Sequence, residues 1–169
     1  MTDLANANPH GYQWLEGTMK QVTPEVAHWL PAGKPGSIGA QYAHVALTED
    51  YFIHGLLQAK SPLMAGAYAG QLGKTQLPPS RSNWGEWGRV IQGDLEQLRA
   101  YAHAVYSAKE ADLASIIDET LQLPIDATKA GMGMQTAVSL LNMLLANAHK
   151  HCGEIAALKG LQGLKRHPV

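Results

Sequence analysis

Residues 140–155 have the sequence Leu140-Leu-Asn-Met-Leu-Leu-Ala-Asn147-Ala-His149-Lys-His151-Cys-Gly-Glu-Ile155. Apolar residues recur here at three- and four-residue steps, which predicts an amphipathic helix from Met132 or Met134 to about Lys159. The predicted apolar stripe consists of Ala137, Leu140, Leu141, Leu144, Ala148, His151, Ile155 and Leu158. Within two turns the apolar run also acquires amide, imidazole, thiol and carboxylate groups, and such groups need polar partners wherever they face inward.

Helical phase separates the polar residues of this stretch. At about 100° per residue, positions four apart lie on nearly the same face. His151 therefore falls within the apolar stripe and Asn147 at its edge, whereas His149 points to the opposite side. Asn147 and His151 form the inward pair, and His149 is predicted to lie at the surface.

Three further helices are predicted upstream of this one. The first ends near Val22 and precedes a short turn of helix that Thr23 caps. The second begins at its cap Ser37 and runs to about Lys60. The third follows residues 82–83 and continues to at least Val105. Residues 112–129 lack a clean period and look extended around the proline at position 124.

These lengths predict an all-α protein, a four-helix bundle in a single domain spanning residues 1–169. Residues 61–83 contain several glycines and two consecutive prolines, Pro78 and Pro79. They form a connection long enough to be a crossover between helices two and three, which would then run parallel.

The composition limits the function classes. The 169 residues include 13 Lys and Arg against 14 Asp and Glu, a net charge of −1. This balance gives no basic stripe for nucleic acid, and no apolar run reaches membrane-spanning length. The single cysteine, Cys152, suits a reducing compartment. The N-terminus lacks the pattern of a signal peptide. A cytoplasmic protein is expected.

The residues that can carry chemistry are histidines on facing helices. His44 is placed at the boundary of the second helix, where it can face His151, while His54 is expected to project away from the core stripe. Two imidazoles with one further ligand can hold a divalent metal in a bundle core. The alternative is that both rings are only hydrogen-bonded within the fold.

Other polar residues near these histidines admit two interpretations each. Cys152 is either a buried inert thiol, which its position beside the stripe favours, or a reactive thiolate. Glu49 and Glu154 could each orient a histidine or pair with an arginine such as Arg89 or Arg99. The sequence contains no nucleophile elbow, phosphate loop, dinucleotide fingerprint, CxxC or HExxH motif.

Three motifs, taken together in their order and spacing, resemble the DinB-like superfamily of damage-inducible bundle proteins. They are Trp29-Leu-Pro31-Ala-Gly-Lys-Pro-Gly-Ser37-Ile38, then His44-Val-Ala-Leu-Thr-Glu49-Asp-Tyr-Phe, then Asn147-Ala-His-Lys-His151-Cys-Gly153-Glu-Ile155 followed by Gly160-Leu-Gln-Gly163-Leu. The resemblance spans most of the chain. It implies a four-helix bundle with a long crossover, assembly as a homodimer, and a divalent metal held by three histidines.

Carried over position by position, the three metal ligands fall on His44, Asn147 and His151. Zinc or nickel is the expected metal. Asn147 departs from the family pattern, which has histidine there. An amide oxygen is a harder ligand than imidazole, so this departure implies weaker zinc or nickel binding, a two-histidine site completed by water, or loss of the metal. His149 could replace Asn147 only if the helix rotated or distorted.

Some relatives are metal-dependent transferases that use low-molecular-weight thiols. The first hypothesis is therefore a metal- and thiol-dependent transferase or hydrolase whose partner is a small thiol. The alternative is a non-catalytic dimeric bundle that has lost its metal site. A third possibility is a metal-free pocket for a small molecule, lined by Tyr51, Trp87 and Met143. Fold resemblance by itself transfers no reaction.

Overall fold

Helices make up almost all of the regular structure in the computed structural model, which describes residues 12–33, 35–71, 84–114 and 116–167. The first helical segment spans residues 12–18. The remaining elements are α2 (Pro24–His28), α3 (Ile38–Glu49), the π-helix η1 (Asp50–Leu57), the 3-10 turn η2 (Leu63–Ala65), α4 (Trp84–Val90), α5 (Leu95–Ala114), α6 (Asp118–Leu121), β1 (Pro124–Asp126), the 3-10 turn η3 (Thr128–Ala130), β2 (Met134–Thr136) and α7 (Ala137–Leu161).

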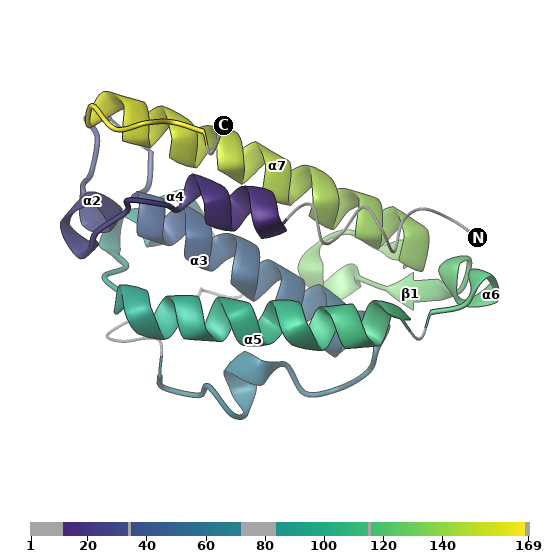
Figure 1. Cartoon of the computed structure of the whole chain (residues 1–169). Helices are drawn as coiled ribbons and strands as arrows, with labels where there is room; N and C mark the ends of the chain where they lie inside the picture. The colour runs from purple at the N-terminus through teal and green to yellow at the C-terminus, as the bar shows by residue number, and fades with distance from the viewer. Residues whose placement is uncertain (1–11, 34, 72–83, 115, 168–169) are drawn as a thin grey trace.

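The long helices form a bundle around α3. In Figure 1, α3 lies between α7 and α5, and segment 12–18 lies across the front of these helices. Helices α3 and α5 run in the same direction and α7 runs opposite to both, as their colours show. A parallel pair needs a crossover, and the chain between η1 and α4 supplies it. The predicted four-helix bundle with a long crossover is therefore confirmed.

Side-chain caps fix where the helices begin. Ser37 Oγ accepts a hydrogen bond from Ala40 N at 3.2 Å, which satisfies one free amide at the start of α3. Thr23 caps α2 in the same way, as predicted. The cap of α7 is Thr136, so the last helix begins three to five residues after the predicted start at Met132 or Met134.

The predicted third helix is two helices in the structure. Helix α4 ends at Val90 and α5 begins at Leu95. Asp94 Oδ1 accepts a hydrogen bond from Gln97 N at 3.0 Å and thereby caps the start of α5. Gly93, directly before the cap, disfavours a continuous helix. The Gly-Asp pair was the sequence signal for this break.

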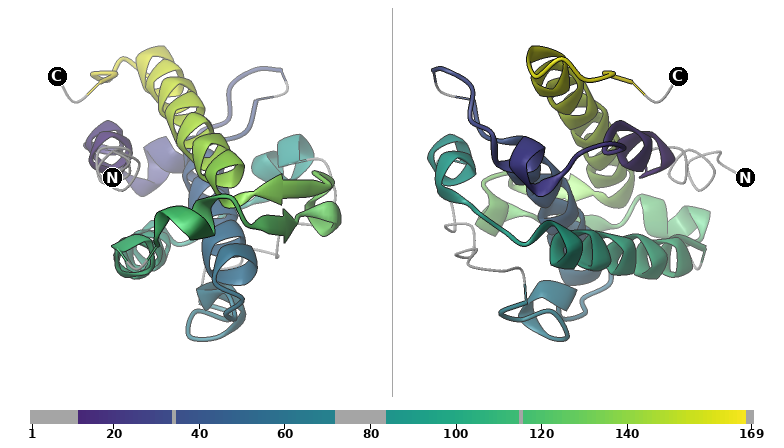
Figure 2. Two further views of the ribbon diagram at one scale, coloured as in Figure 1. Left: turned by 90° about the vertical axis from the view of Figure 1, so that its right-hand side faces the viewer. Right: turned by 60° about the vertical axis from the view of Figure 1, so that its left-hand side comes forward.

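A short hairpin separates α6 from α7. Strands β1 and β2 pair antiparallel, with Ile125 opposite Gln135. The connection contains Gly131 at φ +80° and Gly133 at φ +65°, conformations that glycine adopts without steric cost. The prediction of extended chain around Pro124 is correct for β1, whereas β2 was assigned to the last helix. Figure 2 shows the hairpin at one end of the bundle, beside the start of α7.

Two apolar clusters form the core. The larger one includes Leu15, Ile38, Tyr42, Val105 and Ile155, and it joins segment 12–18 to α3, α5 and α7. The smaller one packs η1 against the hairpin region and the first turns of α7. Full burial of each large aliphatic side chain contributes about 1.5–3 kcal/mol. The contact between α3 and α7 in this core determines where the side chains of the candidate site lie.

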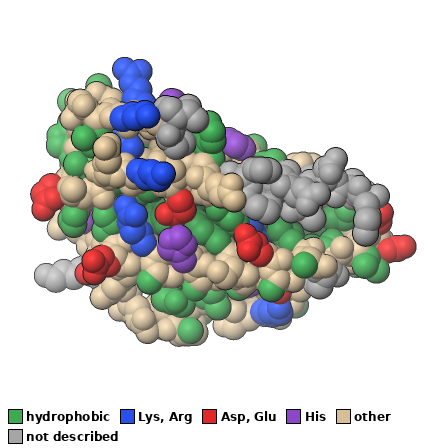
Figure 3. Space-filling view, viewed as in Figure 1, with side chains coloured by type: hydrophobic (Ala, Val, Ile, Leu, Met, Phe, Trp, Pro, Cys, Tyr) green, Lys and Arg blue, Asp and Glu red, His purple; other side chains and the backbone are tan. Residues whose placement is uncertain are grey.

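The surface carries charges of both signs. On the face in Figure 3, acidic, basic and histidine side chains lie among apolar ones. Within the described ranges, no helix is both long enough and apolar enough to cross a bilayer.

Candidate metal centre

Helices α3 and α7 bring the predicted histidines together. The ring centroids of His44 and His151 lie 4.7 Å apart, with the ring planes inclined at 64°. The Asn147 side chain lies close enough to the His44 ring to raise the pKa of that imidazole. His149 is exposed, as helical phase predicted. The three residues assigned by resemblance therefore lie in one place, although they are 107 positions apart at most (151 − 44).

Polar atoms without hydrogen-bond partners concentrate at this place. Among the described residues, five buried side-chain atoms of four neighbouring residues have no hydrogen-bond partner: His44 Nδ1, Asn147 Nδ2, His151 Nδ1, His151 Nε2 and Glu154 Oε2. An unpartnered buried polar atom costs about 1–3 kcal/mol. Such a concentration indicates a place where an ion, water or ligand completes the structure.

Both imidazoles are neutral near pH 7. Burial, together with the charges of His151 and Lys150, lowers the pKa of His44 to about 4. Burial also lowers the pKa of His151 to about 4, with a smaller contribution from Lys150. A neutral imidazole keeps a nitrogen lone pair, which is the form that coordinates a metal.

Two further side chains border the histidines. The Trp84 ring, from α4, meets the His44 ring edge-on at a centroid distance of 4.2 Å and is 39% exposed. Glu154, one turn after His151 on α7, has its Oε2 atom 2.6 Å from His151 Nδ1. The Trp84 ring also packs edge-on against the Trp87 ring, with the centroids 5.1 Å apart.

The donor set fits a divalent ion only with an amide or water as its third ligand. In the described part of the chain, no three His, Cys, Asp or Glu side chains are arranged to hold a metal. His44 and His151 supply two neutral nitrogens, and Asn147 supplies an amide oxygen. The unpartnered ring nitrogens of His44 and His151 agree with this set, whereas the unpartnered atom of Asn147 is the donor Nδ2 and not the amide oxygen. The set suits a site that keeps open positions rather than a closed structural zinc site.

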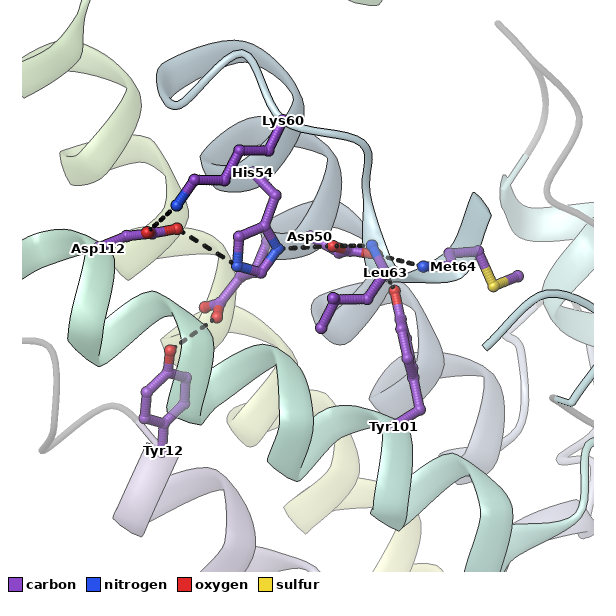
Figure 4. A network of polar contacts seen from close by, with 9 residues as sticks. Tyr12, Asp50, His54, Lys60, Leu63, Met64, Tyr101 and Asp112 are labelled. Atoms are coloured by element: carbon purple, nitrogen blue, oxygen red, sulfur yellow. Dashed lines mark hydrogen bonds and ion pairs between the residues drawn. The ribbon is translucent and has the colours of Figure 1, made fainter. Parts of the chain in front are cut away.

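A second polar network, not predicted from the sequence, lies where α3 continues into η1 (Figure 4). Asp50 accepts hydrogen bonds from His54 Nδ1 at 2.7 Å, Tyr101 Oη at 2.8 Å, and Leu63 N and Met64 N at 2.9 Å each. Asp50 and His54 are 1% and 3% exposed. The network attaches the start of the crossover to α3 and α5.

The expectation that His54 projects away from the core is wrong. The prediction used a period of 3.6 residues, but residues 50–57 form a π-helix with a wider turn. The changed phase turns His54 inward, where its Nε2 lies 3.5 Å from Asp112 Oδ2. The Asp50–His54 spacing of four residues was the sequence signal for this contact.

The remaining predicted polar residues have definite partners. Glu49 pairs with Lys109, whose Nζ lies 2.8 Å from Glu49 Oε2, and not with an arginine. Arg89 and Arg99 donate to backbone carbonyls instead. Cys152 is buried, and burial raises the pKa of its thiol to about 11, which agrees with an inert thiol.

The three residues of the predicted metal-free pocket are divided between the two apolar clusters. Trp87 belongs to the larger apolar cluster, whereas Tyr51 and Met143 pack against the smaller one.

Comparison with known proteins identifies the family of the chain. A family model described as the DinB superfamily matches residues 11–155. A crystal structure of a conserved protein from Enterococcus faecalis is similar, with a TM-score of 0.77 and 22% sequence identity over 94% of each chain. At this identity the similarity shows the fold alone. The search of curated proteins gives no match. With its bundle fold and a family match over most of its length, the chain belongs to the DinB superfamily.

Proposed function

We propose that the protein binds one divalent metal ion between α3 and α7 through His44, Asn147 and His151. The observation that carries the proposal is the pair of facing imidazoles: His44 and His151 have ring centroids 4.7 Å apart and buried ring nitrogens without hydrogen-bond partners. Buried polar groups are rarely left unpaired in native proteins, and two neutral imidazoles beside an amide oxygen form a coherent ligand set. The superfamily resemblance assigns ligands to the same three positions.

A metal held here would act on a small molecule. When bound with open positions, a divalent ion lowers the pKa of a coordinated thiol or water and so supplies a nucleophile near neutral pH. The chain contributes two imidazoles held neutral by burial. We therefore propose a metal-dependent transferase or hydrolase that uses a low-molecular-weight thiol or water.

The first experiment is metal analysis of protein purified without a histidine tag. One equivalent of metal is expected, and metal-free protein should be stabilised by added zinc, nickel or manganese. His44→Ala and His151→Ala should abolish this stabilisation. His149→Ala is the matched control, because it removes an exposed imidazole from the same helix, and it should bind metal normally. A wild-type protein without stoichiometric metal or metal-dependent stabilisation would support the vacated site instead.

Asn147→His tests convergence of the three side chains. A third imidazole at this position should raise zinc affinity. A hundredfold increase would add about 2.7 kcal/mol of stabilisation at a fixed, saturating zinc concentration. Isothermal titration of metal-free protein measures the change. Unaltered zinc affinity would mean that position 147 does not reach the ion.

The thiol step requires a separate screen. Metal-loaded protein is mixed with low-molecular-weight thiols, and thermal stability is followed for wild type and His44→Ala. Stabilisation that depends on both the metal and His44 would support thiol activation. Thiol binding of equal strength by metal-free protein would contradict it.

A further inference from the structure

Glu154 makes an unusual contact with the candidate metal centre. Its Oε2 atom and His151 Nδ1 lie 2.6 Å apart, and both atoms are buried. The Glu154 side chain is nevertheless 41% exposed as a whole, so it is the carboxylate end that reaches inward. This carboxylate also lies close enough to His44 for its charge to favour the protonated form of that ring.

The contact is short but lacks the angles of a hydrogen bond, since neither atom has a hydrogen-bond partner. Two electronegative atoms at this separation require a proton between them. The terminal torsion of a glutamate is broad and allows the carboxylate to turn at little cost. A small rotation would direct the lone pair of Oε2 at a proton on Nδ1.

A metal-binding imidazole needs such an acceptor. Only one ring nitrogen can coordinate the ion, and the hydrogen bond made by the other nitrogen decides which one it is. Carboxylates commonly fill this role beside metal-bound histidines. Among the described residues, Glu154 is the carboxylate within ion-pair distance of His151.

We propose that Glu154 is a positioning residue: its carboxylate accepts the proton on His151 Nδ1 and thereby leaves Nε2 as the nitrogen that faces the metal. This inference rests on the proposed metal site. It assigns Glu154 no direct coordination, in agreement with the absence of a third His, Cys, Asp or Glu ligand among the described residues. It also explains why a carboxylate with access to solvent turns toward the core.

The first test needs no metal. Two-bond proton–nitrogen spectra of ¹⁵N-labelled, metal-free protein identify the tautomer of each imidazole, and His151→Asn assigns the His151 signals. Wild type is expected to carry the proton on Nδ1. Glu154→Ala should shift the proton toward Nε2. Glu154→Gln should keep it on Nδ1, because the amide oxygen can still accept. A wild-type His151 protonated on Nε2 overturns the inference.

The second test is metal affinity. Glu154→Ala should weaken zinc binding about tenfold to a hundredfold, and Glu154→Gln should recover part of the loss. Glu96→Gln removes an exposed carboxylate from α5 and serves as the control for net charge. Because alanine is a good helix former, circular dichroism of the Glu154→Ala variant should show an intact fold.

The outcomes separate the two proposals. If wild type binds zinc and Glu154→Ala binds it equally well with an unchanged tautomer, the positioning role is wrong and the metal site stands. If wild type binds no metal, the proposed function fails, and the tautomer spectra still show whether Glu154 holds His151.

Discussion

Replacing Asp50 tests the energetic importance of the polar network at the start of the crossover. Asp50 is 1% exposed and accepts four hydrogen bonds, from His54, Tyr101, Leu63 N and Met64 N. Asp50→Ala removes the shared acceptor of all four donors. Hydrogen bonds to a charged group contribute about 1.5–3 kcal/mol each, which sets an upper range of about 6–12 kcal/mol for four.

Two effects reduce this upper range. The Leu63 and Met64 amides belong to half-buried residues, so water can replace part of what they lose. The substitution also removes the cost of burying the carboxylate itself. We therefore expect Asp50→Ala to lower the free energy of unfolding by about 4 kcal/mol, within the range for breaking a buried charged pair. Asp50→Asn, which keeps the volume and one acceptor oxygen, should lose about 2 kcal/mol.

The assay is urea unfolding followed by far-UV circular dichroism, with the slope m compared between variants. Lys60→Ala is the control. This variant removes a charged side chain at the edge of the network, where Lys60 pairs with Asp112. Because the Lys60 side chain is 56% exposed, its removal should lower the free energy of unfolding by less than about 1 kcal/mol. Limited proteolysis should also cut residues 58–71 faster in Asp50→Ala. A loss below about 1 kcal/mol for Asp50→Ala, or equal losses for Asp50→Ala and Lys60→Ala, would refute the assigned importance of the network.

Two further predictions concern buried ionisable groups. Among the described residues, Lys109→Met leaves the buried Glu49 carboxylate with the Tyr12 hydroxyl at 3.2 Å as its one hydrogen-bond donor. The variant should destabilise the protein by about 3–5 kcal/mol, whereas Lys109→Met with Glu49→Gln should restore much of the loss. Burial raises the pKa of Glu49 above its value in the unfolded chain, so without Lys109 the folded variant holds a proton that the unfolded chain releases. The stability of the variant should therefore be greatest at acidic pH and fall as pH rises toward the raised pKa of Glu49; a pH-independent stability would contradict this. Because burial raises the pKa of Cys152 to about 11, native protein should resist alkylation near pH 8 and react only after unfolding; rapid labelling of native protein would show an accessible thiolate instead.

The sequence was most informative where the helix is regular. Over the 25 residues of α7, a constant period places His151 inward, Asn147 at the edge and His149 at the surface, and the structure agrees at all three positions. Hydrophobic periodicity and caps such as Ser37 were likewise sufficient for the bundle. These features are local, so they can be recognised without knowledge of the tertiary contacts.

The errors arise where tertiary contacts override the local pattern. The π-helix changes the phase of residues 50–57, and His54 therefore turns inward to Asp50. Strand β2 is three residues long, too short for alternation to distinguish it from the helix that follows. The partner of Glu49 was also unpredictable, because Lys109 is 60 positions away and meets it only in the folded bundle.

The site itself was only partly predictable. The resemblance to the superfamily identified His44, Asn147 and His151 as candidate ligands. The helical phase by itself predicted that His151 points inward. Trp84 could not be assigned to the His44 ring because α4 and α3 are separated by the crossover. Glu154, by contrast, lies three residues after His151, and this spacing on a helix was a usable signal.

The most direct test of the metal site is anomalous X-ray diffraction from crystals of wild-type protein grown with zinc. The expected result is one anomalous peak between α3 and α7, about 2.0–2.2 Å from a ring nitrogen of His44, a ring nitrogen of His151 and the amide oxygen of Asn147. No peak at this place, or a peak coordinated by His149 in its stead, would contradict the proposed metal centre.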